Sequence, residues 1–179
     1  MLKLKSIQKI NDPDFDEIYK LYYSAFPPNE RRTRTELELI FEATDNFFIN
    51  SIHFNAEFAG LLNFWKFDDF IYLEHFAIAE KFRSQKTGST LLKNFMENTN
   101  VSIIIEVEQS TNALAARRIN FYEKLGFNLI NLPYAQPPYD GISEFIPMHI
   151  MSNDASFAIA HFEHIKNNIY ENVYSWRQE

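Results

Sequence analysis

The 179-residue sequence contains no cysteine, only four glycines and no long apolar run. Without cysteine, the chain has no disulfide, no thiolate metal ligand and no thiol nucleophile, which fits the cytoplasmic location that we expect. The scarcity of glycine excludes collagen-like and flexible-linker proteins. No apolar run reaches the ~18 residues of a membrane span, and no signal-peptide core follows Met1–Lys5. We therefore expect no membrane attachment.

Basic residues are also few, with 17 Lys and Arg against 24 Asp and Glu, for a formal net charge of −7. Affinity for nucleic acids and for anionic membrane surfaces comes mainly from Lys and Arg. The sequence therefore predicts neither partner. What the chain has instead is 46% hydrophobic and 16% aromatic residues, enough for a substantial core in one domain.

Hydrophobic periodicity predicts alternating strands and helices. Alternation over 2–10 predicts a strand, and apolar residues three and four apart predict a helix from Pro13 to Phe26. The other expected strands are 46–54, 58–67, 70–79, 101–107, 127–132 and 145–151, and the other expected helices are 35–44, 90–98 and 112–125. Gly126 is expected to cap the last of these helices, and 133–143 is expected to be irregular. This order predicts a mixed α/β or α+β domain.

A final helix is expected after Asp154, which is a suitable N-cap. Its apolar stripe comprises Ala158, Phe162, Ile165, Ile169, Val173 and Trp176. We therefore divide the chain into a main domain, 1–152, and a C-terminal helical extension, 153–179, packed on the same domain. The stripe either covers the core or forms a homodimer contact, and the sequence does not choose between them.

A short loop, Arg83–Ser89, connects the strand that ends in Phe76-Ala77-Ile78 to the next helix. Unpaired N–H groups and the helix dipole make such a helix start an anion site, although an ordinary strand-to-helix connection has the same order. A nucleotide P-loop is excluded, because that motif needs a glycine before its lysine and a Gly-Lys pair. Here Lys86 and Thr87 precede Gly88.

A second segment, Phe121-Tyr122-Glu123-Lys124-Leu125-Gly126-Phe127, follows about thirty residues later. Together, the two segments resemble the acyl-CoA loop and the helix end of the GNAT superfamily of N-acetyltransferases. The resemblance covers about residues 1–152 and implies a mixed, mostly antiparallel sheet flanked by helices. It also implies acetyl transfer from acetyl-CoA, as cosubstrate, to a primary amine of a small molecule.

Two departures from the family pattern leave an alternative open. Lys86 occupies the place of the first loop glycine, and a non-glycine residue there needs a negative φ or a strained loop. The stretch between Val107 and Tyr122 is also about one helical turn longer than usual. The alternative is a catalytically weak acyl-CoA-binding or interaction module with the same fold.

The resemblance implies two catalytic residues. Tyr122 corresponds to the family tyrosine that assists the departing thiolate. Glu74 is the first candidate for the base, since neutralising an alkylammonium at pH 7 costs about 4–5 kcal/mol. Glu106, Glu108 or a water chain are the alternatives, and His75 is expected on the opposite strand face from Glu74.

Binding residues follow from the same resemblance. The expected acetyl-CoA residues are Phe76, Ala77, Ile78, Arg83, Ser84, Gln85, Lys86, Thr87, Gly88, Ser89, Asn112 and Arg118. The expected acceptor residues are Phe26, Arg31, Tyr72, Tyr134 and Tyr139. Arg31 and Arg32 equally suit a solvated basic cluster. The histidines have no metal-ligand spacing, so no metal is expected.

Overall fold

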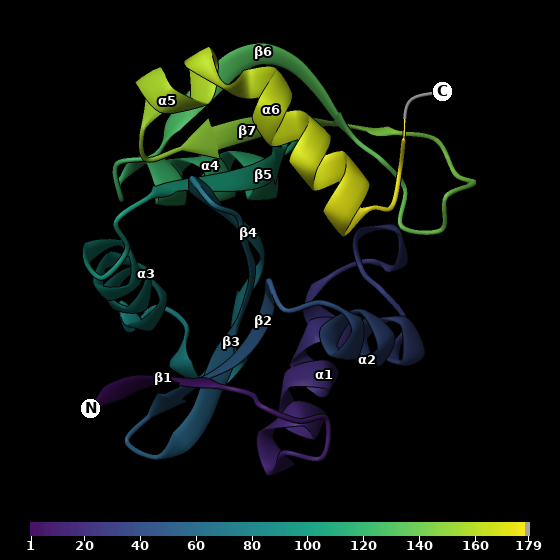
Figure 1. The fold of residues 1–179 in the computed structure, drawn as a ribbon. Helices are drawn as coiled ribbons and strands as arrows, with labels where there is room; N and C mark the ends of the chain where they lie inside the picture. The colour runs from purple at the N-terminus through teal and green to yellow at the C-terminus, as the bar shows by residue number, and fades with distance from the viewer. Residues whose placement is uncertain (178–179) are drawn as a thin grey trace. The chain divides into compact units, whose positions relative to one another are not determined.

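The computed structural model describes residues 1–177 and separates into two compact units. The first unit comprises residues 1–67 and 73–99, and the second comprises 68–72 and the chain from Asn100 onward. Hydrogen bonding gives a seven-stranded sheet of order β1-β2-β3-β4-β5-β7-β6. The mixed α/β fold expected from the sequence is confirmed (Figure 1).

The first unit contains the N-terminal strands and three helices. Its elements are β1 (Leu2–Ser6), α1 (Pro13–Ala25), the 3-10 turn η1 (Pro28–Glu30), α2 (Arg34–Ala43), β2 (Phe47–Phe54), β3 (Glu57–Lys66), most of β4 (Phe70–Ile78), the 3-10 turn η2 (Glu80–Phe82) and α3 (Thr87–Glu97). In Figure 1, α1 and α2 lie on one side of β2 and β3, and α3 lies on the other. β1 and β2, and likewise β2 and β3, pair antiparallel.

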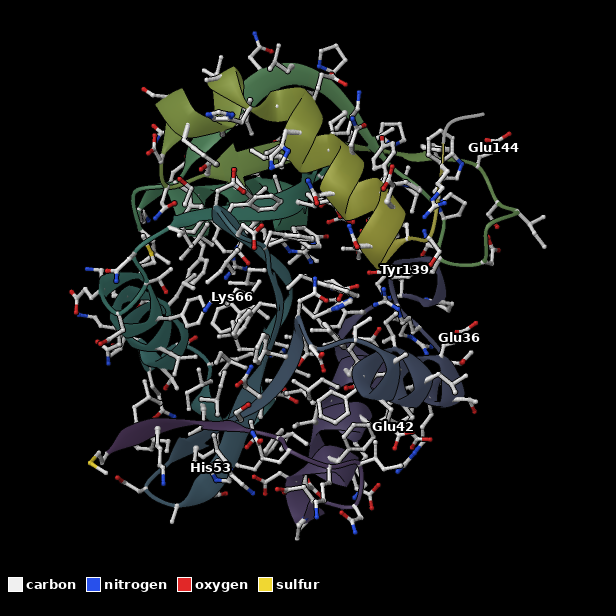
Figure 2. The ribbon with its side chains drawn as sticks, viewed as in Figure 1. Glu36, Glu42, His53, Lys66, Tyr139 and Glu144 are labelled. Carbon is white, nitrogen blue, oxygen red and sulfur yellow. The ribbon has the colours of Figure 1, made fainter. Side chains whose placement is uncertain are left out.

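Local sequence signals explain where α1 and α2 begin. Asp12 caps α1 by accepting a hydrogen bond from the Asp14 backbone N–H, and Pro13 occupies the first turn, where no N–H is needed. Thr33 and Glu36 form a capping box at the start of α2, in which each side chain binds the other's backbone N–H. Figure 2 shows Glu36 and Glu42 projecting outward from α2.

β3 supplies the centre of the first unit's core. Trp65 is fully buried and faces Phe47 at a ring distance of 4.8 Å, whereas Phe64 packs against Phe95 of α3 at 5.2 Å. These alternate faces explain why β3 is apolar over most of its length. Gly60 allows β4 to approach closely, because a Cβ there would lie 2.4 Å from the Ala77 carbonyl oxygen.

The second unit contains the C-terminal half of the chain. Its elements are β5 (Ser102–Glu108), α4 (Ala113–Glu123), β6 (Asn128–Gln136), β7 (Ile146–Ser152), α5 (Ala155–Ala160), α6 (Phe162–Asn168) and a π-helical turn η3 (Ile169–Val173), together with the start of β4. β7 pairs antiparallel with both β5 and β6. Gly126, with φ +94°, follows α4 as expected.

Two expectations in this half were wrong. β6 continues through Pro133 to Gln136, because its register with β7 shifts between Ile130 and Tyr134 and accommodates the proline. The final helix is not continuous: it breaks at His161 and ends in the π turn. The stripe residues Ala158, Phe162, Ile165, Ile169 and Val173 are nevertheless buried, whereas Ile159 beside them is exposed. Residues 178–179 of the expected extension lie outside the described residues.

Within 1–177, no helix combines the length and the apolar character that a bilayer crossing requires.

Candidate functional site

The loop before α3 presents an exposed helix start. Residues 83–86 are exposed, and α3 begins at Thr87 without a side-chain cap. The Arg83 Nε donates to the Ile78 carbonyl at 2.9 Å, which fixes the loop to the end of β4. The first N–H groups of a helix have no partner within the helix and carry its positive dipole end. This geometry suits a phosphate group.

Lys86 adopts the left-handed conformation, with φ 61° and ψ 7°, as does Ser84 with φ 62°. A side chain costs about 1–2 kcal/mol in this region, which glycine occupies freely. Of the two alternatives that the sequence left open at Lys86, a negative φ or a strained loop, the structure has the strained loop. The strain places the lysine at the N-cap of α3 with its side chain exposed.

Gly88 seats the start of α3 against the end of β4. A Cβ at this position would lie 3.2 Å from Ile78 Cγ1 and 3.4 Å from Phe76 Cζ. The absence of a side chain thus lets the helix start approach Phe76–Ile78 closely. The structure thereby brings together the expected cofactor residues 76–78 and 83–89, all within the first unit.

Glu74 is held in a buried polar network. Its side chain is fully buried, its Oε1 is ion-paired with Arg32, and its Oε2 accepts from Trp65 Nε1 at 2.9 Å. Burial opposes ionisation, but the Arg32 charge and the Trp65 hydrogen bond outweigh it, so the Glu74 pKa lies below its usual range. A low pKa disfavours Glu74 as a base. The contacts give it a structural role, and catalysis by Glu74 remains a prediction.

Two sequence expectations are corrected beside Glu74. Arg32 is not a solvated cation but is 6% exposed. His75 does not face away from Glu74: its ring lies edge-on to Tyr22 at 4.7 Å and Phe26 at 4.5 Å, on the helical side where Glu74 meets Arg32. Burial lowers the His75 pKa, which favours the neutral ring.

The other expected acceptor residues of this unit form a small cluster after α1. The Arg31 Nε donates to the Phe26 carbonyl at 2.9 Å, and its guanidinium lies over the Tyr23 ring at 3.7 Å. Arg31 therefore fixes the η1 loop. Its use in binding an acceptor remains a prediction.

Tyr122 lies in the second unit, near the end of α4. It is 8% exposed and contacts Phe121 and Phe127 at ring distances of 5.2 and 5.6 Å. Burial raises the pKa of Tyr122 to about 12, and Arg118 opposes the rise. The hydroxyl is thus protonated at neutral pH and is able to donate a hydrogen bond.

Asn112 and Arg118, at the start and in the middle of α4, each have a partner within the second unit. Asn112 is the N-cap, and its Oδ1 accepts from the Leu114 and Ala115 N–H groups at 2.9 Å each. Arg118 is ion-paired with Glu108 at 2.9 Å. These contacts explain both residues structurally. Their contact with a cofactor remains a prediction.

Glu106 is the centre of a tyrosine cluster in the second unit. Tyr72 and Tyr174 each donate a hydroxyl to its Oε2 at 2.7 Å, and Tyr134 donates to its Oε1. The sequence analysis placed Tyr72 and Tyr134 in an acceptor site but missed Tyr174. The distance along the chain between Glu106 and Tyr174 hides this contact from any local pattern.

No group of three or more His, Asp or Glu side chains within residues 1–177 has the arrangement of a metal site.

Comparison with known proteins identifies the family. The model of the Acetyltransferase (GNAT) family matches residues 15–127. A GNAT-family protein from Bacteroides thetaiotaomicron is 31% identical, with a TM-score of 0.92 over 98% of this chain and 99% of its own. No curated protein matches the sequence significantly.

More distant structures share the fold. The ribosomal-protein-S18-alanine N-acetyltransferase of Escherichia coli is 22% identical, with a TM-score of 0.57 over 85% of this chain and 92% of its own. A GNAT acetyltransferase from Elizabethkingia anophelis, solved with acetyl-CoA bound, is 16% identical, with a TM-score of 0.56 over 84% and 96%. On the family match and the first of these structures, the chain belongs to the GNAT family of acetyltransferases.

Proposed function

We propose that this protein is an N-acetyltransferase that moves an acetyl group from acetyl-CoA to a primary amine of a small molecule. The observation that carries the proposal is the exposed start of α3, seated by Gly88 against the end of β4. Family membership and the acetyl-CoA-bound relative support it. In this proposal, residues 1–152 form the catalytic domain, and 153–179 are its helical extension.

The first unit supplies the diphosphate site. The N–H groups of Thr87, Gly88 and Ser89 open α3, and the Arg83 and Lys86 side chains are exposed beside them. Backbone N–H groups and cations are the donors that phosphate oxygens require. Ser84 and Gln85 complete the loop, and Phe76, Ala77 and Ile78 form the adjoining strand end. Acetyl-CoA brings the activated thioester.

Tyr122 acts as a hydrogen-bond donor to the sulfur. With its pKa at about 12, full proton transfer to a thiolate of pKa ~8.5 is uphill by about 4–5 kcal/mol. A hydrogen bond that strengthens as the thiolate develops does not carry this cost. The family resemblance is the basis for placing this hydroxyl at the thioester.

The amine proton leaves through Glu74, Glu106 or a water chain. The low Glu74 pKa and its pairing with Arg32 weigh against Glu74 as the direct acceptor. Tyr72, Tyr134 and Tyr139 of the second unit are proposed acceptor residues. Phe26 and Arg31 of the first unit are proposed as acceptor residues on the family resemblance alone.

The test is thiol release from acetyl-CoA against a panel of primary amines. We predict turnover with at least one amine, and a Tyr122→Phe rate lower by at least tenfold with the Kd for CoA unchanged. Tyr19→Phe, a comparable change on α1, should retain the wild-type rate. An unchanged Tyr122→Phe rate removes this tyrosine from the mechanism. CoA binding without thiol release across the panel supports the weakly catalytic alternative, which the strained Lys86 favours.

A further inference from the structure

The second unit contains a carboxylate surrounded by tyrosines, and the arrangement of this cluster narrows the class of acceptor. Glu106 of β5 accepts three phenolic hydrogen bonds, from Tyr72 on β4, Tyr134 on β6 and Tyr174 after the π turn. The Tyr72 and Tyr174 hydroxyl oxygens lie 3.2 Å apart. Four segments of the chain thus converge on one carboxyl group.

The tyrosine hydroxyls fix the character of this group. Burial, followed by the nearby Glu106 carboxylate, raises the pKa of Tyr134 and Tyr174 well above the usual range, so both hydroxyls stay protonated and donate. A carboxylate that accepts these hydrogen bonds carries a negative charge, and its two oxygens together offer about four acceptor positions. The cluster therefore concentrates one negative charge among aromatic rings.

The surrounding rings extend the cluster towards solvent. Tyr139 lies edge-on to Tyr174 at 4.9 Å, and Tyr170 lies 5.8 Å from Tyr134. Tyr139, Tyr170 and Glu106 are each partly exposed, whereas Tyr72, Tyr134 and Tyr174 are buried. Figure 2 shows Tyr139 on the loop between β6 and β7, with Glu144 farther out on the same loop.

An aromatic surround with a central carboxylate is suited to an organic ammonium ion. The ring faces attract a cation, and a carboxylate pairs with it. An anionic group would be repelled by Glu106, and a neutral group would gain from the rings alone. The cluster is thus expected to distinguish cationic ligands from neutral and anionic ones.

We propose that Glu106 with Tyr72, Tyr134, Tyr139 and Tyr174 forms the recognition site for the acceptor, and that the site selects amines that arrive as alkylammonium ions without a nearby carboxylate. This inference rests on the proposed function and narrows its substrate class. It makes Tyr174 a specificity-determining residue outside residues 15–127, the part that the family model matches.

The experiment measures binding without acetyl-CoA, using three probes of equal chain length. Isothermal titration of the full chain with hexylamine, hexanol and hexanoate separates the ammonium from its neutral and anionic counterparts. We expect hexylamine to bind at least tenfold tighter than hexanol, and hexanoate to bind more weakly than both. Equal affinities for hexylamine and hexanol would overturn the proposal.

Variants locate the binding. Glu106→Gln should weaken hexylamine binding by at least tenfold and leave hexanol unchanged, whereas Glu144→Gln removes the same charge from an exposed loop and should change neither. If Glu106→Gln fails to fold, Tyr139→Leu, which removes a partly exposed ring and keeps the carboxyl group, should weaken hexylamine binding at least threefold. Wild-type hexylamine affinity in the variant that folds would show that the cluster only anchors the C-terminal segment.

The two proposals fail separately. An acetyl-transfer rate that is unchanged in Glu106→Gln contradicts this inference alone. Glu106-dependent hexylamine binding in a protein that binds no CoA contradicts the proposed function alone.

Discussion

At the residue scale, Lys86 combines a backbone cost with a charge at the helix start. Its φ of 61° is unfavourable for any side chain, yet the residue stands at the exposed start of α3, where an anion is proposed to bind. Strain retained at such a position is a common property of functional loops. The backbone and the charge of Lys86 make opposite predictions for stability and for binding.

Replacing Lys86 by glycine tests both effects. Lys86→Gly should raise the free energy of unfolding by about 1 kcal/mol, because glycine adopts this conformation without strain. The Kd for CoA should rise severalfold, because a cation facing the diphosphate is lost.

Lys86→Met is the matched control, since it removes the charge but keeps the strain. It should weaken CoA binding equally with no gain in stability, as measured by denaturant unfolding and calorimetric titration. Unaltered CoA affinity in both variants would remove Lys86 from the phosphate site.

Glu74 makes a second prediction at this scale. Glu74→Gln leaves Arg32 buried without its counter-charge, so it should lower the free energy of unfolding by about 3–5 kcal/mol. The double variant Arg32→Met with Glu74→Gln should cost less than the single change. Equal losses of unfolding free energy in the single and double variants would show that the unpaired Arg32 charge does not cause the destabilisation.

The pH dependence follows from the direction of the Glu74 pKa. Because folding lowers this pKa, the stabilisation is complete above the unfolded value near 4.5 and is lost as the pH falls through the folded value. Denaturant unfolding between pH 7 and 3 should show a smaller acid-dependent loss in Glu74→Gln than in the wild type. The same variant also tests catalysis. If the acetyl-transfer rate of Glu74→Gln is low at neutral pH and recovers at high pH, where free amine is abundant, Glu74 is the base.

At the element scale, most helices and strands follow from periodicity and caps. α1 and α2 begin at Pro13 and Arg34, within a residue of their expected starts, because Asp12 and Thr33 are strong local N-caps. β6 and the C-terminal helices differ because tertiary pairing carries β6 past Pro133 and a break at His161 divides the expected final helix. Neither the continuation of β6 nor the helix break at His161 can be recognised from the neighbouring residues in the sequence.

The residues of the candidate site also fall into two groups, those that the local sequence predicts and those that it does not. The strand end, loop and helix start of the proposed anion site were predictable because they are contiguous in the sequence. The partners of Glu74 and Glu106 were not, because Arg32 lies 42 residues from Glu74, and Tyr174 lies 68 residues from Glu106. Long-range side-chain pairing determines both environments.

The approach of β3 to β4 gives a prediction at this scale. Gly60→Ala would place a Cβ 2.4 Å from the Ala77 carbonyl oxygen, a backbone atom that moves only with its strand. We expect a loss of at least about 2 kcal/mol in the free energy of unfolding. Gly88→Ala is the control: the nearest atoms belong to side chains at 3.2 Å or more, so it should cost less in denaturant unfolding. A larger loss of unfolding free energy in Gly88→Ala than in Gly60→Ala would contradict the close approach of β3 to β4.

At the scale of the whole molecule, an acidic protein is proposed to bind an anionic cosubstrate. With a formal net charge of −7, long-range attraction does not favour CoA. Binding must therefore come from local groups, namely the α3 N–H groups and the Arg83 and Lys86 side chains. Local phosphate contacts also predict that added salt weakens the affinity.

Titration of the full chain with CoA by calorimetry tests the central claim most directly. We predict saturable binding of one CoA per chain, with a Kd below about 100 μM that rises between 0.05 and 0.5 M salt. Folded protein that gives no heat of binding at several temperatures, and no shift in Tm with millimolar CoA, would contradict the account.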